Sequence, residues 1–277
     1  MSTRKFAVIG HPIGHTMSPF IHQRLFELAD EKGNYTVLDI APQELSEKMN
    51  VLNELSGYNI TIPHKQTIIP FLDRLDKKAA LYGSVNTVRN GTVREGFTTD
   101  PDGFLKALAY GGIPFRGNVV IVGCGGAART FVYEAALAGC CITLAARSPG
   151  KAASLAKEVT QKIPQTTIQS CLIDDLQGEF DLLVNATPVG MYPKTDTVPV
   201  SDRVLSHCRN VFDAIYNPLE TVLIQKAQAN GSAAVGGMSM LVWQAVAAHE
   251  IWDSSVYSAD DINQLIEDSA KELKKKF

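Results

Sequence analysis

Residues 119–151, VVIVGCGGAARTFVYEAALAGCCITLAARSPGK, decide the fold of this chain. The apolar run Val119–Val122 predicts a strand, the pattern Gly123-x-Gly125-x-x-Ala128 predicts a tight turn, and residues 127–138 follow a helical pattern. Gly123 allows the turn, Gly125 lets a phosphate approach the backbone, and the small Ala128 lets the helix pack on the strand. The helix then directs its positive N-terminus toward the pyrophosphate of a dinucleotide. The alternative is an ordinary strand–helix turn without a ligand.

The residues after the second predicted strand, Cys141–Ala145, favour NADP over NAD. An NAD site places an acidic residue near the ribose 2'-hydroxyl, whereas this chain has Ala146, Arg147 and Ser148 there, with Lys151 just beyond. Cations suit a 2'-phosphate because they form charge-assisted hydrogen bonds with it. We therefore interpret this segment as the start of an NADP-binding Rossmann domain.

Size and composition indicate a globular protein that acts on small molecules. A chain of 277 residues is long enough for two domains. The net charge of -3 gives no general attraction for nucleic acid or membranes, so we expect neither as a partner. Five cysteines without metal-type spacing argue against a disulfide framework or a metal site and favour a reducing cytoplasm. The apolar run Phe6–Ile9 is too short for a signal peptide or a membrane span, so it predicts a first strand.

Alternating element patterns predict an α/β fold, with an N-terminal mixed-sheet domain followed by a doubly wound Rossmann domain. In the first domain we expect strands at residues 6–9, 34–40 and 57–62 and a helix from about 19 to 32. Asn90-Gly91 predicts a hairpin turn between strands 85–88 and 92–94. In the second domain, residues 180–184 and 210–214 predict further parallel strands. A helix at 104–110 and a hinge at GGIPFRGN lead from the first domain into the second. Two helices follow the second domain, one from Ser239 and one over 259–275.

The first domain carries polar residues at strand ends and turns, in GHPIGHTMSP, GYNITIPHK, GSVNTV and GFTTD. Turn chemistry alone explains any one of these stretches, because Asn, Thr and Ser side chains bond to turn backbones. Together they indicate a cleft for a small polyhydroxylated acid, which many hydrogen bonds would orient. The candidate groups are hydroxyls, amides, one ammonium and one carboxylate: Thr16, Ser18, Thr61, Asn59, Asn86, Lys65 and Asp100.

Hydride transfer to or from NADP requires a general acid/base, because an alkoxide is too basic to form in water at neutral pH. Histidine is the common choice, and His64 draws attention because it adjoins Lys65. The other candidates of this type are His11, His15, His22, His207 and His249. Lys65 with Asp100 is the alternative couple, and a surface salt bridge is the non-catalytic interpretation of that pair.

At these residues the chain resembles the shikimate dehydrogenase family over nearly its whole length. GHPIGHTMSPFIHQ is similar to the family's G-x-P-I-x-H-S-x-S-P-x-x-H-N, and GYNITIPHK to G-x-N-V-T-x-P-x-K. GSVNTV, NATPVGM, DAIYNPLET and MLVWQ also occupy their expected places. The resemblance implies an oxidoreductase that uses NADP to reduce 3-dehydroshikimate reversibly to shikimate in aromatic amino-acid biosynthesis. It further implies that residues 1–103, completed by helices in 238–277, bind the substrate across a cleft from an NADP domain at 104–237. The sequence leaves open whether the protein is a monomer or a homodimer.

The resemblance also implies a role for each matching residue. Lys65 and Asp100 would form the catalytic couple, with Lys65 nearest the proton that moves, and Thr16 and Ser18 would hold the ring carboxylate. The ring hydroxyls or carbonyl would bind Asn59, Thr61, Asn86, Asp100 and Gln244, and Tyr216 would close on the substrate from the cofactor side. Gly123 would form the turn, and the pyrophosphate would lie on Gly125, Gly126, Ala127 and Ala128. The 2'-phosphate would bind Arg147, Ser148 and Lys151, and the nicotinamide would lie near backbone atoms of Ala214 and Gly237.

Three positions depart from the family pattern. Thr16 replaces a serine, Thr98-Thr99-Asp100-Pro101 replaces N-T-D-G, and His249 replaces an aromatic residue. Thr16 keeps a hydroxyl but adds a methyl beside the carboxylate pocket, and Pro101 stiffens the turn that holds Asp100. Quinate is therefore the alternative substrate, for a quinate/shikimate dehydrogenase or a specialised paralogue. A non-catalytic NADP-binding sensor is a third interpretation, against which the presence of both Lys65 and Asp100 argues.

Overall fold

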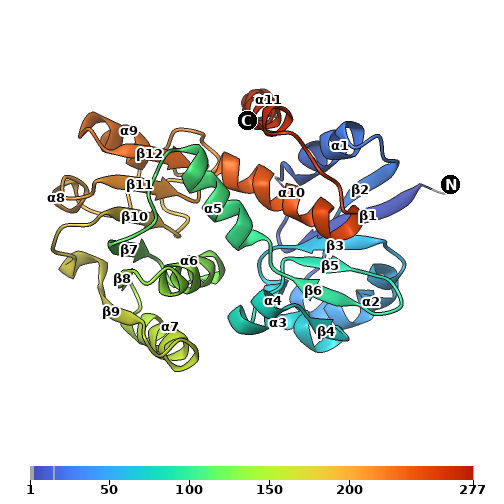
Figure 1. Ribbon diagram of the computed structural model, residues 1–277, viewed down its shortest axis with the longest axis horizontal. Helices are drawn as coiled ribbons and strands as arrows, with labels where there is room; N and C mark the ends of the chain where they lie inside the picture. The colour runs from blue at the N-terminus through green and yellow to red at the C-terminus, as the bar shows by residue number, and fades with distance from the viewer. Residues whose placement is uncertain (1–2, 15, 277) are drawn as a thin grey trace. The chain divides into compact units, whose positions relative to one another are not determined.

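A computed structural model describes residues 3–14 and 16–276, and its contacts divide the chain into two compact units. The first unit combines Met1–Gly103 with Val242–Phe277, and the second is Phe104–Leu241. Each contains its own six-stranded sheet (Figure 1). None of the helices in the described part of the chain combines the length and apolar character that a membrane span needs.

The sheet of the first unit is mixed, in the order β2-β1-β3-β5-β6-β4. β1 pairs in parallel with β2 and β3, whereas β3, β5 and β6 pair antiparallel and β4 joins β6 in parallel. The mixed-sheet α/β prediction is confirmed. The strands are β1 (Arg4–Gly10), β2 (Gly33–Asp39), β3 (Gly57–Ile60), β4 (Arg74–Leu75), β5 (Thr87–Arg89) and β6 (Glu95–Phe97).

The first unit is discontinuous in sequence because the helix α10 packs its last turn on β1. The Trp252 ring lies 4.6 Å from the Phe6 ring, and its indole N–H donates to the carbonyl oxygen of Val88 over 2.9 Å. Such an aromatic pair adds about 0.5–1.5 kcal/mol beyond the burial of its area. The helices of this unit, including those that cross its borders, are α1 (Ser18–Leu28), α2 (Leu45–Asn53), α3 (His64–Thr67), α4 (Lys77–Tyr82), α5 (Asp100–Tyr110), α10 (Met238–Asp253) and α11 (Ala259–Lys276).

The hairpin predicted around Asn90-Gly91 is wrong in its length. Arg89 pairs with Glu95, so residues 90–94 form a five-residue loop and the predicted strand 92–94 is absent from it. Asn90 Nδ2 donates to the carbonyl oxygens of Leu52 and Leu55 over 2.8 and 2.9 Å. This side chain therefore ties the loop to the end of α2, which outweighs the local preference for a two-residue turn.

The second unit is a doubly wound Rossmann fold. All neighbouring strands are parallel in the order β12-β11-β10-β7-β8-β9, so the strand order reverses between β7 and β10. β10 is buried throughout, as expected for a parallel strand covered on both faces. The predicted Rossmann class is confirmed. The strands are β7 (Asn118–Val122), β8 (Cys141–Ala146), β9 (Thr167–Leu172), β10 (Leu182–Asn185), β11 (Asn210–Asp213) and β12 (Ala233–Gly236).

Aromatic packing explains where the second unit begins. Phe104 of α5 lies 4.6 Å from Phe131 and 5.0 Å from Phe212, measured between ring centroids, and all three side chains are fully buried. α5 begins four residues before the predicted Phe104, because Pro101 fits the first turn of a helix. The other helices of this unit are α6 (Gly126–Leu137), α7 (Pro149–Lys162), α8 (Asp202–Leu205) and α9 (Val222–Ala229).

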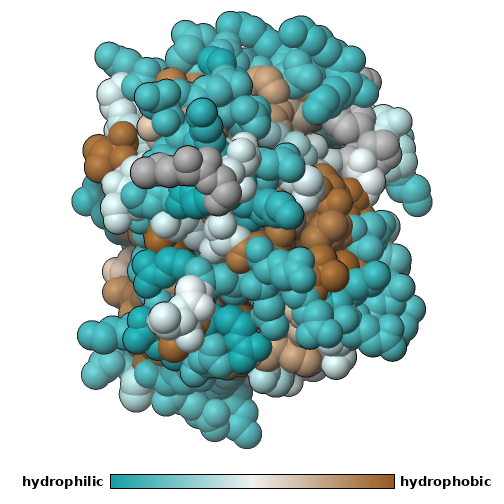
Figure 2. All heavy atoms as spheres, turned by 90° about the vertical axis from the view of Figure 1, so that its right-hand side faces the viewer, coloured by the Kyte–Doolittle hydropathy of each residue, from teal (hydrophilic) through white to brown (hydrophobic). Residues whose placement is uncertain are grey.

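Most large apolar side chains are buried in these two cores. Hydrophilic residues accordingly cover most of the face shown in Figure 2, where hydrophobic residues reach the surface mainly in one strip at the right-hand side.

Candidate active site

Lys65 and Asp100 form a largely buried ion pair in the first unit. Lys65 lies on α3, and Asp100 is the first residue of α5, where the helix dipole favours a carboxylate. Lys65 Nζ lies 2.5 Å from Asp100 Oδ2, and the two side chains are 17% and 6% exposed. Water screens such a pair far less than it screens a surface salt bridge. The arrangement can hold an ammonium group in a defined place beside a ligand.

Asn86 fixes the second oxygen of this carboxylate. Its Nδ2 donates to Asp100 Oδ1 over 2.8 Å and lies 3.3 Å from Oε1 of Gln244. Its Oδ1 accepts from the backbone N–H of Thr99 over 2.7 Å. Asn86 is buried, and a buried amide bonded at both ends has one preferred orientation. The structure therefore brings together four residues that the sequence singled out: Lys65, Asn86, Asp100 and Gln244.

A row of side-chain hydrogen bonds continues from Asn86 to the start of α1. The hydroxyl of Thr87 donates to the Asn86 amide oxygen over 3.1 Å, and Asn59 Nδ2 donates to Thr87 Oγ1 over 3.0 Å. Tyr35 Oη donates to Asn59 Oδ1 over 2.7 Å and also hydrogen-bonds Ser18. A further 3.1 Å bond from the Thr16 hydroxyl to Ser18 Oγ completes the row. Stretches far apart in the sequence thus contribute to one polar surface.

Sequence reasoning missed Tyr35, Thr87 and Thr99 as members of this surface. Thr87 and Thr99 adjoin Asn86 and Asp100 in the motifs GSVNTV and FTTD, so motif neighbours could have indicated them. Tyr35 carries no such signal, because it occupies an apolar position of a strand and only its hydroxyl reaches the row.

Thr61 is a predicted substrate residue outside the row, and Thr98 and Pro101 are two of the positions that depart from the family pattern. Thr61 follows β3, is half-buried, and its backbone N–H donates to the carbonyl oxygen of Ile9 over 2.9 Å. Thr98 is 4% exposed, and its hydroxyl has no hydrogen-bond partner among the residues that the structure describes. Pro101 is the second residue of α5, so the change from glycine is compatible with the helix start that carries Asp100.

The described histidines make no hydrogen bond to Lys65 or Asp100. His64 is fully buried, and its Nε2 is bonded to the carbonyl oxygen of Ile40 over 2.6 Å. This bond gives Nε2 of His64 a structural partner, while Lys65 and not His64 is bonded to Asp100, which favours Lys65 as the acid/base. The other described histidines are His11, His22, His207 and His249, while His15 lies outside the described residues.

The glycine turn of the second unit has the shape that a pyrophosphate requires. Gly123 has a φ of 113°, and a Cβ there would lie 3.0 Å from the carbonyl oxygen of Ala186. Gly125 is the N-cap of α6 and Gly126 its first residue, and a Cβ on either would meet nothing within 4 Å. Ala128 is fully buried, as expected where the helix packs on the sheet. Open space in front of exposed helix amides fits a phosphate group.

The residues predicted to hold the rest of the cofactor follow the carboxyl ends of three strands of this sheet, β8, β11 and β12. Arg147, Ser148 and Lys151 follow β8 and are all exposed, so their polar groups are accessible to a phosphate. The backbone N–H of Gly237 donates to the carbonyl oxygen of Ile215 over 2.9 Å. A side chain at position 237 would collide with the carbonyl group of Ala214, so this approach requires glycine.

Two further titratable residues lie at the carboxyl end of β11, Asp213 as its last residue and Tyr216 three positions beyond. Tyr216, predicted to close on the substrate, is half-buried in the second unit, and burial raises its pKa above the ordinary 10.0. Asp213, which sequence reasoning missed, is fully buried. Its Oδ2 accepts from Thr221 Oγ1 over 2.6 Å, and its Oδ1 accepts from Asn185 Nδ2 over 2.9 Å. Asp213 therefore joins β10 and β11 beside the strand-order reversal.

We expect Asp213 to make stability depend on pH. Burial raises its pKa from 3.8 to about 6, so the protonated form favours folding below 3.8 and this contribution is lost as pH rises through 6. Between pH 4 and pH 7 the free energy of unfolding should fall by about 2–3 kcal/mol relative to Asp213→Asn. Urea unfolding followed by circular dichroism tests this. A difference between wild type and Asp213→Asn that stays constant over this pH range would contradict the expectation.

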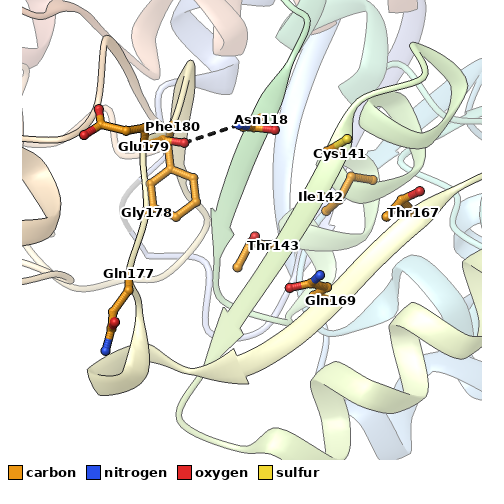
Figure 3. A pocket seen from close by; sticks show the side chains of 10 residues that line it. All are labelled: Asn118, Cys141, Ile142, Thr143, Thr167, Gln169, Gln177, Gly178, Glu179 and Phe180. Carbon is orange, nitrogen blue, oxygen red and sulfur yellow. Dashed lines mark hydrogen bonds between the residues drawn. The ribbon is translucent and has the colours of Figure 1, made fainter.

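A cavity of about 260 Å³ lies at the amino ends of the strands of the second sheet, opposite the end that carries the glycine turn (Figure 3). Asn118, Cys141 and Thr167 are the first residues of β7, β8 and β9, and they line it together with Gln177 and Glu179. Ligands of doubly wound sheets bind at the carboxyl ends of the strands. This cavity is therefore distinct from the glycine turn and is not the candidate cofactor site.

Comparisons with known proteins identify the family. Residues 8–88 match the model described as the shikimate dehydrogenase substrate binding domain. The shikimate dehydrogenase (NADP(+)) of Caldanaerobacter subterraneus subsp. tengcongensis is 35% identical over 272 residues, which cover 96% of this chain and 97% of that protein. The chain belongs to the shikimate dehydrogenase family.

Other members of the shikimate dehydrogenase family agree with this assignment. The shikimate dehydrogenase (NADP(+)) of Methanocaldococcus jannaschii is 38% identical over 260 residues, covering 90% of this chain and 91% of that protein. A crystal structure of shikimate 5-dehydrogenase from Thermus thermophilus, in complex with NADP(H) and shikimate, matches with a TM-score of 0.87 and 30% identity. It covers 96% of this chain and 99% of that one. The family predicted from the motifs is confirmed.

Proposed function

We propose that this shikimate dehydrogenase family member catalyses the reversible, NADP-dependent reduction of 3-dehydroshikimate to shikimate in aromatic amino-acid biosynthesis. The observation that carries the proposal is the Lys65–Asp100 pair, held by Asn86 at the end of a row of hydrogen-bonding side chains. The names of the relatives support the cofactor, and the Thermus thermophilus complex supports the substrate. Five free thiols suit a reducing cytoplasm as the site of action.

Lys65 is the proposed acid/base. When bound, NADP(H) donates or accepts the hydride at the carbon that carries the reacting oxygen. Lys65 Nζ lies nearest that oxygen, gives it a proton during ketone reduction and removes the proton during alcohol oxidation. Asp100 orients the ammonium group through the 2.5 Å contact, and Asn86 holds Asp100 in place. An alkoxide is thereby avoided in both directions.

The hydroxyl row supplies the proposed substrate contacts. Thr16 and Ser18 bind the ring carboxylate. Both N–H groups of Asn59 are directed at protein acceptors, and Tyr35 donates to its Oδ1, so a lone pair of Oδ1 is left for a ring hydroxyl. The other residues proposed to contact the ring are Thr61, Asn86, Asp100, Tyr216 and Gln244.

The second unit supplies the proposed cofactor contacts. Gly123 forms the turn, and the amides that begin α6 bind the pyrophosphate. Cationic Arg147 and Lys151, with the hydroxyl of Ser148, bind the 2'-phosphate. The remaining residues are Gly125, Gly126, Ala127 and Ala128 at the pyrophosphate, and Ala214 and Gly237 near the nicotinamide.

Absorbance at the nicotinamide band tests the proposed function. Purified protein mixed with shikimate and NADP should form reduced cofactor, and it should do so faster than with quinate or with NAD. No reduced cofactor, or better turnover with quinate and NAD, would overturn the proposal. Tight NADP binding without any turnover would instead favour a non-catalytic sensor.

Quinate is the second candidate substrate, because Thr16 carries a methyl beside the proposed carboxylate site. We expect Thr16→Ser to change the ratio of kcat/KM for shikimate over quinate by about threefold to tenfold, since one buried methyl group contributes about 0.8 kcal/mol. Steady-state kinetics with both acids measures the ratio. Thr67→Ser, at an exposed threonine on α3 outside the row, is the control. An equal ratio in Thr16→Ser and wild type would show that the Thr16 methyl group does not contribute to discrimination between shikimate and quinate.

A further inference from the structure

Two buried histidines lie behind the hydroxyl row. His22 lies one helical turn after Ser18 on α1, and His249 lies on α10. They are 3% and 0% exposed, and His22 Nδ1 lies 3.1 Å from His249 Nε2. The ring of Tyr35 stacks on His22, with centroids 4.0 Å apart and an angle of 6° between the planes. The histidine pair thus contacts the side chain that joins Ser18 to Asn59.

Tyr257 determines the tautomer of both histidines. Its hydroxyl donates to the carbonyl oxygen of Leu25 over 3.2 Å, so its oxygen accepts from His249 Nδ1, which lies 3.0 Å away. A neutral imidazole protonated at Nδ1 has a lone pair at Nε2. His249 therefore accepts at Nε2 from the Nδ1–H of His22. Burial lowers the pKa of His249 to about 3 and that of His22 well below 6.5, so both rings are neutral near pH 7.

The surroundings of His249 would suit an apolar ring. Phe26 and Trp252 lie 4.6 and 5.6 Å from it between ring centroids. Burying an imidazole among aromatic rings costs free energy unless its nitrogens are hydrogen-bonded, and here both are. These directional bonds fix the rotation of the His22 ring, which packing with a phenylalanine at position 249 would leave less constrained.

We propose that His22 and His249 act as a unit that positions the substrate-binding side chains, by fixing the ring on which Tyr35 stacks and thereby the placement of Ser18 and Asn59. This inference rests on the proposed function. No hydrogen bond joins either histidine to Lys65 or Asp100, so the pair affects substrate binding and not proton transfer.

The test compares His22→Phe, His249→Phe and the double variant in steady-state kinetics. Each single variant should raise KM for shikimate about fivefold to tenfold, with kcat and KM for NADP within twofold of wild type. His249→Phe removes the acceptor of the His22 Nδ1–H, and His22→Phe removes the donor. If the pair acts as a unit, KM of the double variant should not exceed that of the worse single variant. His207→Phe, at an exposed histidine of the second unit, should leave all constants unchanged.

Several results would overturn the inference. KM for shikimate could stay within twofold of wild type in both single variants, or the two effects could multiply independently in the double variant. Nitrogen-15 NMR of the wild-type protein at pH 7 should show both rings neutral and protonated at Nδ1, and an Nε2–H tautomer at His249 would contradict the hydrogen-bond chain even if the variants fail to fold. Absence of turnover by the wild-type protein would overturn the proposed function itself, which distinguishes the two failures.

Discussion

Replacement of Lys65 by methionine should lower kcat for shikimate oxidation by about a thousandfold, within the range expected for loss of a general acid/base. Methionine preserves much of the length of the side chain but cannot carry the proton. KM for NADP should change less than threefold, because the cofactor residues belong to the other unit. Initial rates at saturating shikimate and NADP measure the effect.

The matched control is Lys78→Met. Lys78 also pairs with an aspartate, since its Nζ lies 3.0 Å from Asp102, but these side chains are 42% and 45% exposed. Its replacement should leave kcat within twofold. Because Lys65→Met leaves the Asp100 carboxylate buried without its cation, thermal unfolding must show that the variant folds, and adding Asp100→Asn should restore stability but not activity. A kcat of Lys65→Met within tenfold of wild type would refute the catalytic assignment.

Replacement of Arg147 by alanine should raise KM for NADP about tenfold to a hundredfold while changing KM for NAD less than twofold. A hydrogen bond to a charged group contributes about 1.5–3 kcal/mol, and 1.4 kcal/mol corresponds to a factor of ten. The selectivity of the effect follows from the 2'-phosphate, which NAD lacks. Kinetics with both cofactors at saturating shikimate provide the measurement.

Arg209→Ala is the control for this variant. Arg209 is also an exposed arginine of the second unit, but it precedes β11 and therefore lies at the amino edge of the sheet, where it pairs with Asp181 over 3.0 Å. Its loss should leave both cofactor constants unchanged. If Arg147→Ala weakened NAD and NADP equally, Arg147 would not be the residue that recognises the 2'-phosphate.

The Rossmann unit was predictable because its central segments carry strong local patterns. Val119–Val122 is a continuous apolar run, and the glycine turn that follows has its own spacing. Its edge strands were not predicted: β9 and β12 lie at the two ends of the sheet, and they contain exposed or half-buried residues throughout. An edge strand buries less apolar surface, so its sequence shows less of the pattern.

Some residues of the candidate site were likewise predictable from the sequence, and others were not. Motifs indicated Lys65, Asp100 and Asn86, which the structure connects by hydrogen bonds. Motifs did not indicate Tyr35, because it occupies a strand position where an apolar side chain would be ordinary. Asp213 begins the motif DAIYNPLET, but its place at the end of a buried strand gave no sign of a polar role. Their partners come from other strands and from helix starts, and no local pattern specifies those contacts.

The sequence by itself determined the family, the two-domain α/β class and the residues that carry the polar and cationic groups, since these depend on motif spacing and local periodicity. Only the tertiary structure decided how those groups are connected. It joined Lys65 to Asp100 and Ser18 to Asn59 through Tyr35, bonded Nε2 of His64 to the backbone of Ile40, and paired His22 with His249. The physical reason is that hydrogen-bond partners and burial depend on which segments the sheet and helices bring side by side, and the residues of each such pair are separated by many positions along the chain.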